Sequence, residues 1–276
     1  MIRRGLQAIL TVGLVVAAGC GADQPVCGRV VTFGDSNTDR GFNDSVDVVA
    51  GYLTPVPTAL RPDQGNSRFQ LAGKIELLEP RIRAVNHGIG ATTSGFGRVP
   101  ATSSPNARES VNGVTRFEAE VLGRGYPWSG GETRPIIRVL AFQPTASDYA
   151  YVSIGTNDHD AVMTAADTRC MIATWMGAGL RADHLLLTTL PPNVRTTEIP
   201  ATNDSIRAIA NQTGVHLIDL GGYTSNDGGA TWREVTLHVG DSIHYRERVR
   251  DWLAAQVVAS MKVARCTRDS FSVNVP

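Results

Sequence analysis

Short apolar runs recur along the chain, separated by longer stretches in which apolar and polar residues alternate with a helical period. Five of these runs are rich in β-branched or other apolar residues and close at Gly, Asn or Pro. Such runs are typical of buried strands. They predict strands at residues 29–33, 82–86, 149–154, 184–190 and 215–220.

Helices are predicted between these strands. In the stretch 69–78, the apolar residues Phe69, Leu71, Ala72, Ile75 and Leu78 follow helical spacing. Further helical stretches are predicted at 161–176, 204–212 and 246–263. The alternation of strand and helix predicts the α/β fold class, with a central parallel sheet and helices on both faces.

Residues 95–144 interrupt this alternation. The segment is rich in Ser, Gly, Pro and Arg, and it contains a short predicted helix at 116–122 and an extra strand at 136–142. Long irregular insertions in compact domains are usually functional or disordered. We therefore expect residues 95–144 to form a cap, in which Tyr126 and Trp128 either pack the cap or form a sugar-stacking wall.

Composition narrows the class of protein. The 276 residues are 42% hydrophobic and 19% charged, which excludes disordered, collagen-like and low-complexity chains. One domain is expected over 28–266, with 267–276 as a C-terminal tail. Lys and Arg (26) balance Asp and Glu (26), with no long run of either sign. The chain therefore has no excess of basic residues of the kind that binds nucleic acid, and no nucleic-acid partner is expected.

The N-terminus has the features of an export signal. Arg3 and Arg4 precede an apolar stretch over 6–18 that is too short to span a membrane permanently, so residues 1–19 are predicted to be a cleaved signal peptide. Three small residues then lead into Cys20, an arrangement that resembles a bacterial lipobox. The resemblance implies lipidation of Cys20, with 20–27 as an anchor and linker. The alternative is a simple secretory signal with an incidental cysteine.

The lipobox resemblance also implies a location. Gly21, rather than Asp, follows Cys20, which implies an exported protein anchored to the outer membrane, if the cell has one, and facing the periplasm or the surface. No other apolar stretch is long enough to span a membrane. The lipid anchor is therefore the only expected membrane contact.

Polar residues with catalytic potential follow the predicted strands. Ser36 comes directly after the first strand, Asn157 after the third, and Asp241 and His244 stand three apart ahead of the last helix. Open α/β sheets bind ligands at the carboxyl ends of their strands. A serine hydroxyl becomes a good nucleophile when an imidazole removes its proton and a carboxylate orients that imidazole. The pattern indicates nucleophilic catalysis.

Four ordered blocks, at 34–39, 86–92, 155–158 and 241–244, resemble those of the SGNH (GDSL-like) hydrolase family. The resemblance spans roughly residues 28–262. It implies a flavodoxin-like three-layer α/β/α sandwich and a serine esterase that needs no cofactor and no metal.

The resemblance also implies roles for individual residues. Ser36 would be the nucleophile and a backbone donor to the oxyanion hole, His244 the general base, and Asp241 its orienting carboxylate. Asn157 would donate to the oxyanion hole through its side chain. The block at 86–92 is one residue shorter than the commoner family spacing. Gly90 is therefore our choice for the third donor, with the amides of Gly88 and Ala91 as alternatives.

Several other polar residues have simpler interpretations. His238 is an alternative base, but it lies in an alternating run and is expected to be a strand residue. His159 and Asp160 follow Asn157 and are expected to be exposed residues at a helix start rather than metal ligands. Asp35 is expected to steady its loop by local hydrogen bonds. His87 is expected to pack at the end of its strand, with substrate contact as the alternative.

The expected substrate is a small-molecule or polysaccharide ester. Short-chain esters, especially acetyl groups on carbohydrate, are favoured because the expected cap is polar and has no continuous apolar stripe. The alternatives are a lysophospholipase or thioesterase of the same fold, and a non-catalytic polysaccharide-binding lipoprotein. The sequence leaves the oligomeric state open.

The remaining cysteines are Cys27, Cys170 and Cys266, so at most one internal disulfide can form. Cys27 precedes the first strand, and a last helix that runs back for about 30 Å brings Cys266 to the same edge of the sheet. Export permits a disulfide, and we predict one between Cys27 and Cys266. Cys170 is then expected to be a buried free thiol. The alternative is three reduced, packed cysteines.

Overall fold

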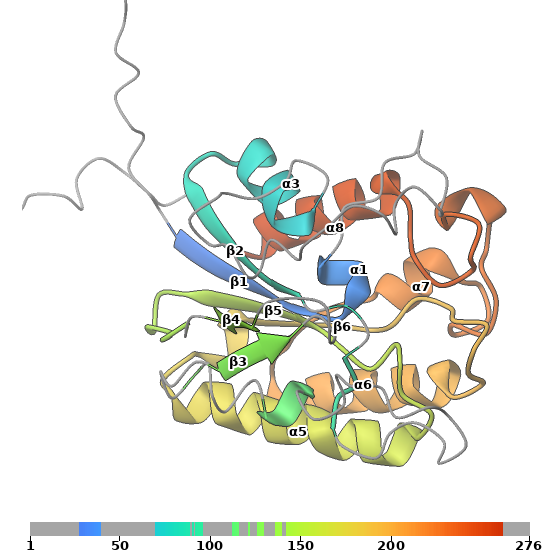
Figure 1. Cartoon of the computed structure of the whole chain (residues 1–276), viewed down its shortest axis with the longest axis horizontal. Helices are drawn as coiled ribbons and strands as arrows, with labels where there is room; N and C mark the ends of the chain where they lie inside the picture. Colours follow the sequence, from blue (N-terminus) through green and yellow to red (C-terminus); the bar gives the residue numbers. More distant parts are fainter. Residues whose placement is uncertain are drawn as a thin grey trace, which may run out of the picture.

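The computed structural model describes residues 28–39, 70–88, 90, 92–95, 112–115, 121, 126–129, 136–139 and 142–261. The predicted signal peptide, lipidation site and cysteine pair (Cys20, Cys27 and Cys266) lie outside these residues. Five parallel strands form the central sheet: β1 (Gly28–Gly34), β2 (Ile82–Gly88), β5 (Tyr149–Ser153), β6 (Leu185–Thr188) and β7 (His216–Ile218). Their order is β2-β1-β5-β6-β7 (Figure 1).

The strand order puts β1 next to the point where the chain reverses its direction across the sheet. β1 pairs with β2 on one side and with β5 on the other, and Gly34 is level with Gly88 and Ser153. The chain adds β2 to one side of β1 and the remaining strands to the other. In doubly wound sheets, ligands bind outside the carboxyl ends of the strands at such a switch point. The loops after β2, β1 and β5 are therefore the ones that can build a site.

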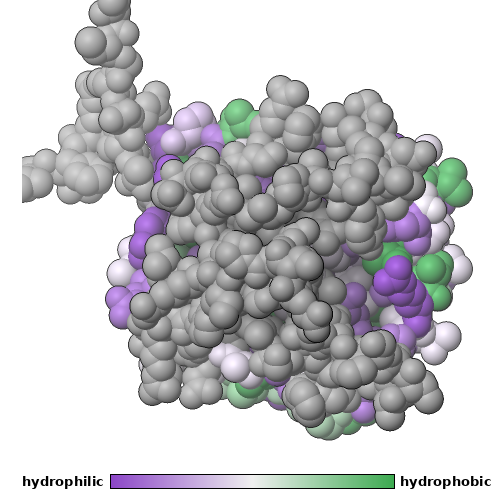
Figure 2. All heavy atoms as spheres, in the orientation of Figure 1, coloured by the Kyte–Doolittle hydropathy of each residue, from purple (hydrophilic) through white to green (hydrophobic). Residues whose placement is uncertain are grey.

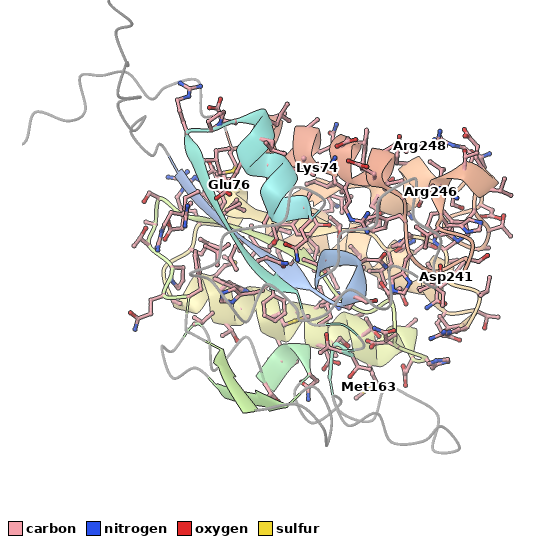
Figure 3. All side chains as sticks on the ribbon, turned by 45° about the horizontal axis from the view of Figure 1, so that its top comes forward. Lys74, Glu76, Met163, Asp241, Arg246 and Arg248 are labelled. Atoms are coloured by element: carbon pink, nitrogen blue, oxygen red, sulfur yellow. The ribbon has the colours of Figure 1, made fainter. Side chains whose placement is uncertain are left out.

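Helices cover both faces of the sheet. In Figure 1, α3 (Leu71–Leu78) and α8 (Glu247–Ser260) lie above it, and α5 (Ala161–Gly177) and α6 (Ile199–Thr213) lie below it. Lys74 of α3 forms ion pairs with Glu247 and, at 2.8 Å, with Asp251 of α8; Figure 3 labels Lys74. The described part of the chain is therefore a three-layer α/β/α sandwich, as predicted.

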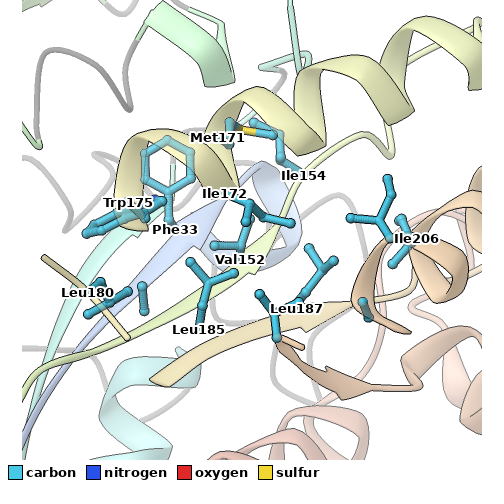
Figure 4. Packing of buried hydrophobic residues seen from close by; sticks show 14 of the residues in the cluster. Phe33, Val152, Ile154, Met171, Ile172, Trp175, Leu180, Leu185, Leu187 and Ile206 are labelled. Carbon is cyan, nitrogen blue, oxygen red and sulfur yellow. The ribbon is translucent and has the colours of Figure 1, made fainter. Parts of the chain in front are cut away.

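The sheet is buried on both faces by two apolar clusters. The first joins β1, β5 and β6 to α5 and α6, and includes Phe33, Val152, Trp175 and Leu187 (Figure 4). The second lies under α3 and α8 and includes Leu71, Tyr245 and Leu253. Burying a large apolar side chain contributes roughly 1.5–3 kcal/mol. Because both faces of the sheet are buried by these clusters, the sequences of the strands are continuous apolar runs.

All five predicted strands and all four predicted helices are present, with shifted ends. The helix predicted at 204–212 begins earlier, at Ile199, with Pro200 in its first turn. Proline suits this position because it has no N–H to donate. Short helices are also present: α1 (Ser36–Asp39), α7 (Leu220–Thr224), η4 (Ala182–His184) and η5 (Val235–Leu237).

The segment 95–144 contains a pair of strands. β3 (Tyr126–Ser129) and β4 (Ile136–Val139) pair antiparallel. β4 matches the extra strand predicted at 136–142 but is shorter, and β3 was not predicted. The helix predicted at 116–122 lies outside the described residues except for Val121. The proposed role of the segment as a cap remains a prediction.

The prediction that Cys170 is buried was wrong. Cys170 is a free thiol, as predicted, but its side chain is exposed. The buried face of α5 is formed by Thr164, Thr168, Met171 and Trp175, which recur every three to four residues. Residue 170 lies outside this stripe, because successive helical residues are about 100° apart.

Among the described residues, no helix has both the length and the apolar character needed to cross a membrane.

Candidate active site

Ser36 is held at the carboxyl edge of the sheet by a tight turn after β1. The Asp35 carboxylate accepts a hydrogen bond from the Asn37 N–H at 3.0 Å, and the Asp35 carbonyl accepts one from the Thr38 N–H at 3.1 Å. A Cβ on Gly34 would overlap the Ser153 carbonyl and the Thr38 side chain. Glycine at position 34 therefore allows the chain to turn beside β5, and Asp35 steadies the turn as expected.

The loop before α8 carries Asp241 and His244. The His244 Nε2 lies 2.7 Å from the Ser36 Oγ, and its Nδ1 lies 2.5 Å from the Asp241 Oδ2. The other carboxylate oxygen, Asp241 Oδ1, accepts the N–H groups of Ile243 at 3.0 Å and His244 at 2.9 Å. A spacing of three residues thus lets one carboxylate bind both the backbone and the imidazole of the same turn.

Electrostatics keep the Asp241 carboxylate charged. Burial would raise its pKa, but the hydrogen bonds from the His244 ring and backbone, together with the Ile243 N–H, outweigh burial and lower the pKa to about 2. A carboxylate that stays ionised can hold the Nδ1–H of an imidazole and stabilise its cation. The hydroxyl, imidazole and carboxylate are therefore arranged for proton transfer from Ser36 to His244.

Asn37 joins the turn after β1 to the loop before α8. Its side-chain amide donates to the Ile243 carbonyl at 3.5 Å and accepts from the Tyr245 N–H at 3.3 Å. Asn37 is buried, and its two partners flank His244 in the sequence. Sequence reasoning did not identify this role. The only available signal was an amide side chain directly after the candidate nucleophile.

The two loops that flank Ser36 carry the other predicted site residues. Gly90 is buried in the turn after β2, and Asn157 follows β5. The Asn157 Nδ2 donates to the Thr92 carbonyl at 3.0 Å, which ties the two loops together. The Gly88 N–H donates to the Asn86 side chain at 2.9 Å, so this alternative donor is already engaged. Ala91, the other alternative, lies outside the described residues.

A buried carboxylate cluster supports the same two loops. The Asp158 Oδ1 accepts the Ser94 N–H at 3.0 Å, and its Oδ2 accepts the Thr164 hydroxyl at 2.7 Å and contacts the Ser94 hydroxyl. The Ser94 hydroxyl also lies 2.8 Å from the Asp167 Oδ2. Burial raises the pKa of Asp158 to about 6, with Asp167 adding to the shift and the hydrogen bonds from Ser94 and Thr164 opposing it. Sequence reasoning did not identify this cluster.

His238, the alternative base, has a different set of partners. Its Nδ1 accepts the N–H groups of Gly240 at 3.0 Å and Ser242 at 3.2 Å. Its backbone forms an isolated antiparallel bridge with Tyr245 and lies in no strand, so the prediction of a strand residue was wrong: residues 235–237 of the alternating run form the short helix η5. The imidazole that meets the Ser36 hydroxyl is that of His244.

The polar residues after Asn157 lead into α5, which begins at Ala161, and His159 among them is half-buried rather than exposed. Asp160 is exposed and caps the helix, with its carboxylate accepting the Met163 N–H at 2.9 Å, as expected for a residue at a helix start. Within the described residues, no group of three or more His, Cys, Asp or Glu side chains is placed to hold a metal ion. His87 is buried and meets the Phe142 ring edge to face at 6.2 Å.

Comparison with known families assigns the class of protein. A family model described as GDSL-like Lipase/Acylhydrolase matches residues 30–257. The molecule is an ester-bond hydrolase with a three-layer α/β/α fold. It belongs to the GDSL-like lipase/acylhydrolase family, which confirms the resemblance drawn from the four sequence blocks. A comparison with curated protein sequences gives no match.

Solved structures share the fold at low sequence identity. An aryl esterase from M. smegmatis is 17% identical, with a TM-score of 0.51 over 84% of this chain and 99% of that chain. A GDSL-like lipase from Bacteroides thetaiotaomicron VPI-5482 is 12% identical, with a TM-score of 0.51 over 86% and 88%. A carbohydrate acetylesterase from Sinorhizobium meliloti is 17% identical, with a TM-score of 0.49 over 86% and 98%.

Proposed function

We propose that the protein is a serine esterase that hydrolyses carboxylic esters through an acyl-enzyme. The observation that carries this proposal is the chain of contacts from Ser36 Oγ to His244 Nε2, at 2.7 Å, and from His244 Nδ1 to Asp241, at 2.5 Å. In this mechanism Ser36 attacks the ester carbonyl carbon while its proton passes to His244. The tetrahedral intermediate then collapses, and the leaving alkoxide takes that proton from His244.

Water completes the reaction at the same base. His244 removes a proton from water as the water oxygen attacks the acyl carbon, and the proton then returns to Ser36 as the carboxylic acid leaves. Negative charge on the carbonyl oxygen would be stabilised by the backbone N–H groups of Ser36 and Gly90 and by the Asn157 side chain. Such donors act most strongly where charge develops in the transition state.

Short-chain esters, especially acetyl esters of carbohydrates, are the proposed substrates. The polar composition of residues 95–144 supports this choice. Figure 2 shows purple hydrophilic and green hydrophobic residues next to one another on the coloured surface at its right.

One observation favours a second candidate, a lysophospholipase or thioesterase. Val162 and Met163, at the start of α5 and just after Asn157, are 78% and 41% exposed. Figure 3 shows Met163 and Asp241 at the same end of the molecule. Such exposed apolar side chains could contact an acyl chain. A series of 4-nitrophenyl esters from acetate to a long acyl chain separates the two candidates, because kcat/KM falls with acyl length for the first and rises for the second.

The assignment of Ser36 is tested by Ser36→Ala. We expect turnover to fall by at least about 1,000-fold while the protein stays folded, and a fluorophosphonate probe to label the wild type but not the variant. His244→Ala should cost a similar factor, because residues that act as a unit are not additive. Equal probe labelling of wild type and Ser36→Ala contradicts the assignment.

We further propose that the protein is exported and anchored through a lipid on Cys20. The proposal rests on the charged, apolar and small-residue pattern of residues 1–20.

A further inference from the structure

We infer that His238 is a positioning residue for the reaction, because its unprotonated Nδ1 holds the loop that presents Asp241 to His244. This inference rests on the proposed function of Ser36, His244 and Asp241. His238 contacts the backbone of the loop and is assigned no chemical step.

The loop is closed at its base by backbone contacts. His238 and Tyr245 form an antiparallel bridge, and the Val239 N–H donates to the His244 carbonyl at 3.0 Å. The Arg246 Nε donates to the His238 carbonyl at 2.8 Å. These contacts fix the two ends of the loop. The contacts that set the conformation of residues 240–243 lie between these two ends.

The His238 ring supplies one of these contacts. Its Nδ1 accepts the Gly240 N–H at 3.0 Å and the Ser242 N–H at 3.2 Å. These two amides belong to the residues on either side of Asp241. One acceptor atom therefore fixes the backbone before and after the carboxylate that orients His244.

Ser242 shows why the loop needs this support. Its φ is +56°, and it is the one non-glycine residue with a positive φ among the described residues. L-residues rarely adopt this conformation, which persists only when surrounding contacts hold it. The Ser242 N–H binds His238, and the Ser242 carbonyl accepts the Trp232 Nε1–H at 3.0 Å. The Trp232 and His238 rings also pack at 5.2 Å. Both backbone polar groups of Ser242 are thus held by one aromatic pair.

The contact requires a neutral imidazole. A protonated Nδ1 carries a hydrogen and cannot accept from the two N–H groups. Burial lowers the pKa of His238, Arg246 lowers it further and Asp241 opposes the shift. Asp241 and Arg246 are the charged groups that act on the ring among the described residues. Burial is the largest influence on the pKa, and it favours the neutral form of His238 that can accept both hydrogen bonds.

Three variants distinguish the effect of the His238 Nδ1 acceptor from the effect of its aromatic ring. His238→Phe keeps an aromatic ring against Trp232 but has no acceptor. His238→Asn keeps an acceptor oxygen at the position of Nδ1, since both atoms are bonded to Cγ. His216→Phe is the matched control, because His216 begins β7 at the opposite edge of the sheet and binds Ser260.

We expect His238→Phe to lower kcat by roughly 10- to 100-fold with little change in KM, because a small misplacement of a catalytic group is costly. His238→Asn should stay within about threefold of wild type, and His216→Phe should match wild type. The pH profile gives a second readout. Protonation of His238 removes its acceptor, so kcat/KM of wild type should fall more steeply at low pH than kcat/KM of His238→Asn.

Amide hydrogen exchange tests the loop contact without any substrate. The Gly240 and Ser242 N–H groups should lose protection in His238→Phe and keep it in His238→Asn. Unchanged protection in His238→Phe overturns the inference, as does a His238→Asn variant as slow as His238→Phe. Fluorophosphonate labelling of Ser36 is a separate measurement that tests the proposed function alone. A wild type that fails to label contradicts the proposed function, and the exchange data still decide the role of His238.

Discussion

Asn157 illustrates how a residue of the candidate site is engaged before substrate arrives. Its side-chain N–H binds the Thr92 carbonyl, an acceptor on the neighbouring loop. An ester oxygen that becomes negatively charged in the transition state is a stronger acceptor than a neutral carbonyl. Asn157 can therefore exchange a ground-state partner for a transition-state partner, which is the condition for raising kcat.

Substitution of Asn157 should consequently act on kcat. We expect Asn157→Ala to lower kcat by about 100- to 1,000-fold with little change in KM. Steady-state kinetics on 4-nitrophenyl acetate measure both constants. Asn157→Asp has the same shape without the N–H and should lose as much. An effect confined to KM would assign Asn157 to ground-state binding instead.

The second residue-scale prediction concerns Asp158, whose pKa burial raises to about 6. A carboxyl with a raised folded-state pKa binds its proton more tightly in the folded protein than in the unfolded chain. Its charge therefore lowers stability as pH rises from about 4 to about 6, and protonation restores that stability below this window.

We expect wild type to gain stability relative to Asp158→Asn as pH falls from 7 to 4, by up to about 3 kcal/mol. Urea unfolding of both proteins at the two pH values measures the difference. Comparison with the variant cancels the carboxylates that do not interact with Asp158, including Asp241, whose lowered pKa acts at more acidic pH. An unchanged difference would show that Asp158 titrates normally.

At the scale of elements, α5 links the candidate site to the core. Its first turn follows Asn157, and Thr164 in its second turn donates to Asp158 at 2.7 Å. Further along, Met171 and Trp175 pack in the apolar cluster against the sheet. The start of α5 therefore holds the loop after β5, and the rest of the helix fixes that start to the sheet.

The cap of α5 can be tested by itself. Asp160 accepts the Met163 N–H, and removal of such a cap costs about 1 kcal/mol. Asp160→Ala should lower the free energy of unfolding by about this amount, whereas Asp160→Asn should lose much less because it keeps an acceptor. Urea denaturation compares the three proteins. Equal losses in the two variants would mean that charge, rather than the cap, stabilises this helix end.

At the scale of the whole molecule, strand order gathers the candidate site. The loops after β2, β1 and β5 carry Gly90, Ser36 and Asn157, and these strands are neighbours in the sheet. His244 comes from the far end of the chain and reaches Ser36 because α8 packs beside α3 over the same sheet. The sandwich therefore brings together residues that are separated by most of the sequence.

The proposed membrane anchor belongs to this scale as well. Wild type should sediment with membranes and incorporate labelled lipid, and Cys20→Ser should do neither because it lacks the thiol that accepts the lipid. Cys27→Ser serves as the control and should still be lipidated. Lipid incorporation into Cys20→Ser would show that the lipobox prediction is wrong.

Local patterns in the sequence were sufficient to predict part of the fold and part of the candidate site. Buried strands appear as apolar runs because both faces of the sheet are covered, and α5 was predicted from its first residue. Asp241 and His244 could be paired because they are three residues apart, and Ser36 could be placed because it follows a strand. These features depend on short-range geometry, which a single sequence contains.

Tertiary structure decided the rest, because the remaining contacts join residues that no local pattern relates. Asn37 reaches Ile243 and Tyr245 across most of the chain, and Ser94 meets Asp158 and Asp167 only when the loop after β2 packs against the loop after β5 and helix α5. His238 lies in an alternating run of the sequence, and its proposed positioning role depends on a loop that folds two backbone amides onto its ring. Periodicity thus predicted the layers, and the resemblance of the four sequence blocks implied the candidate reacting groups, whereas the packing of distant loops determined what holds those groups in place.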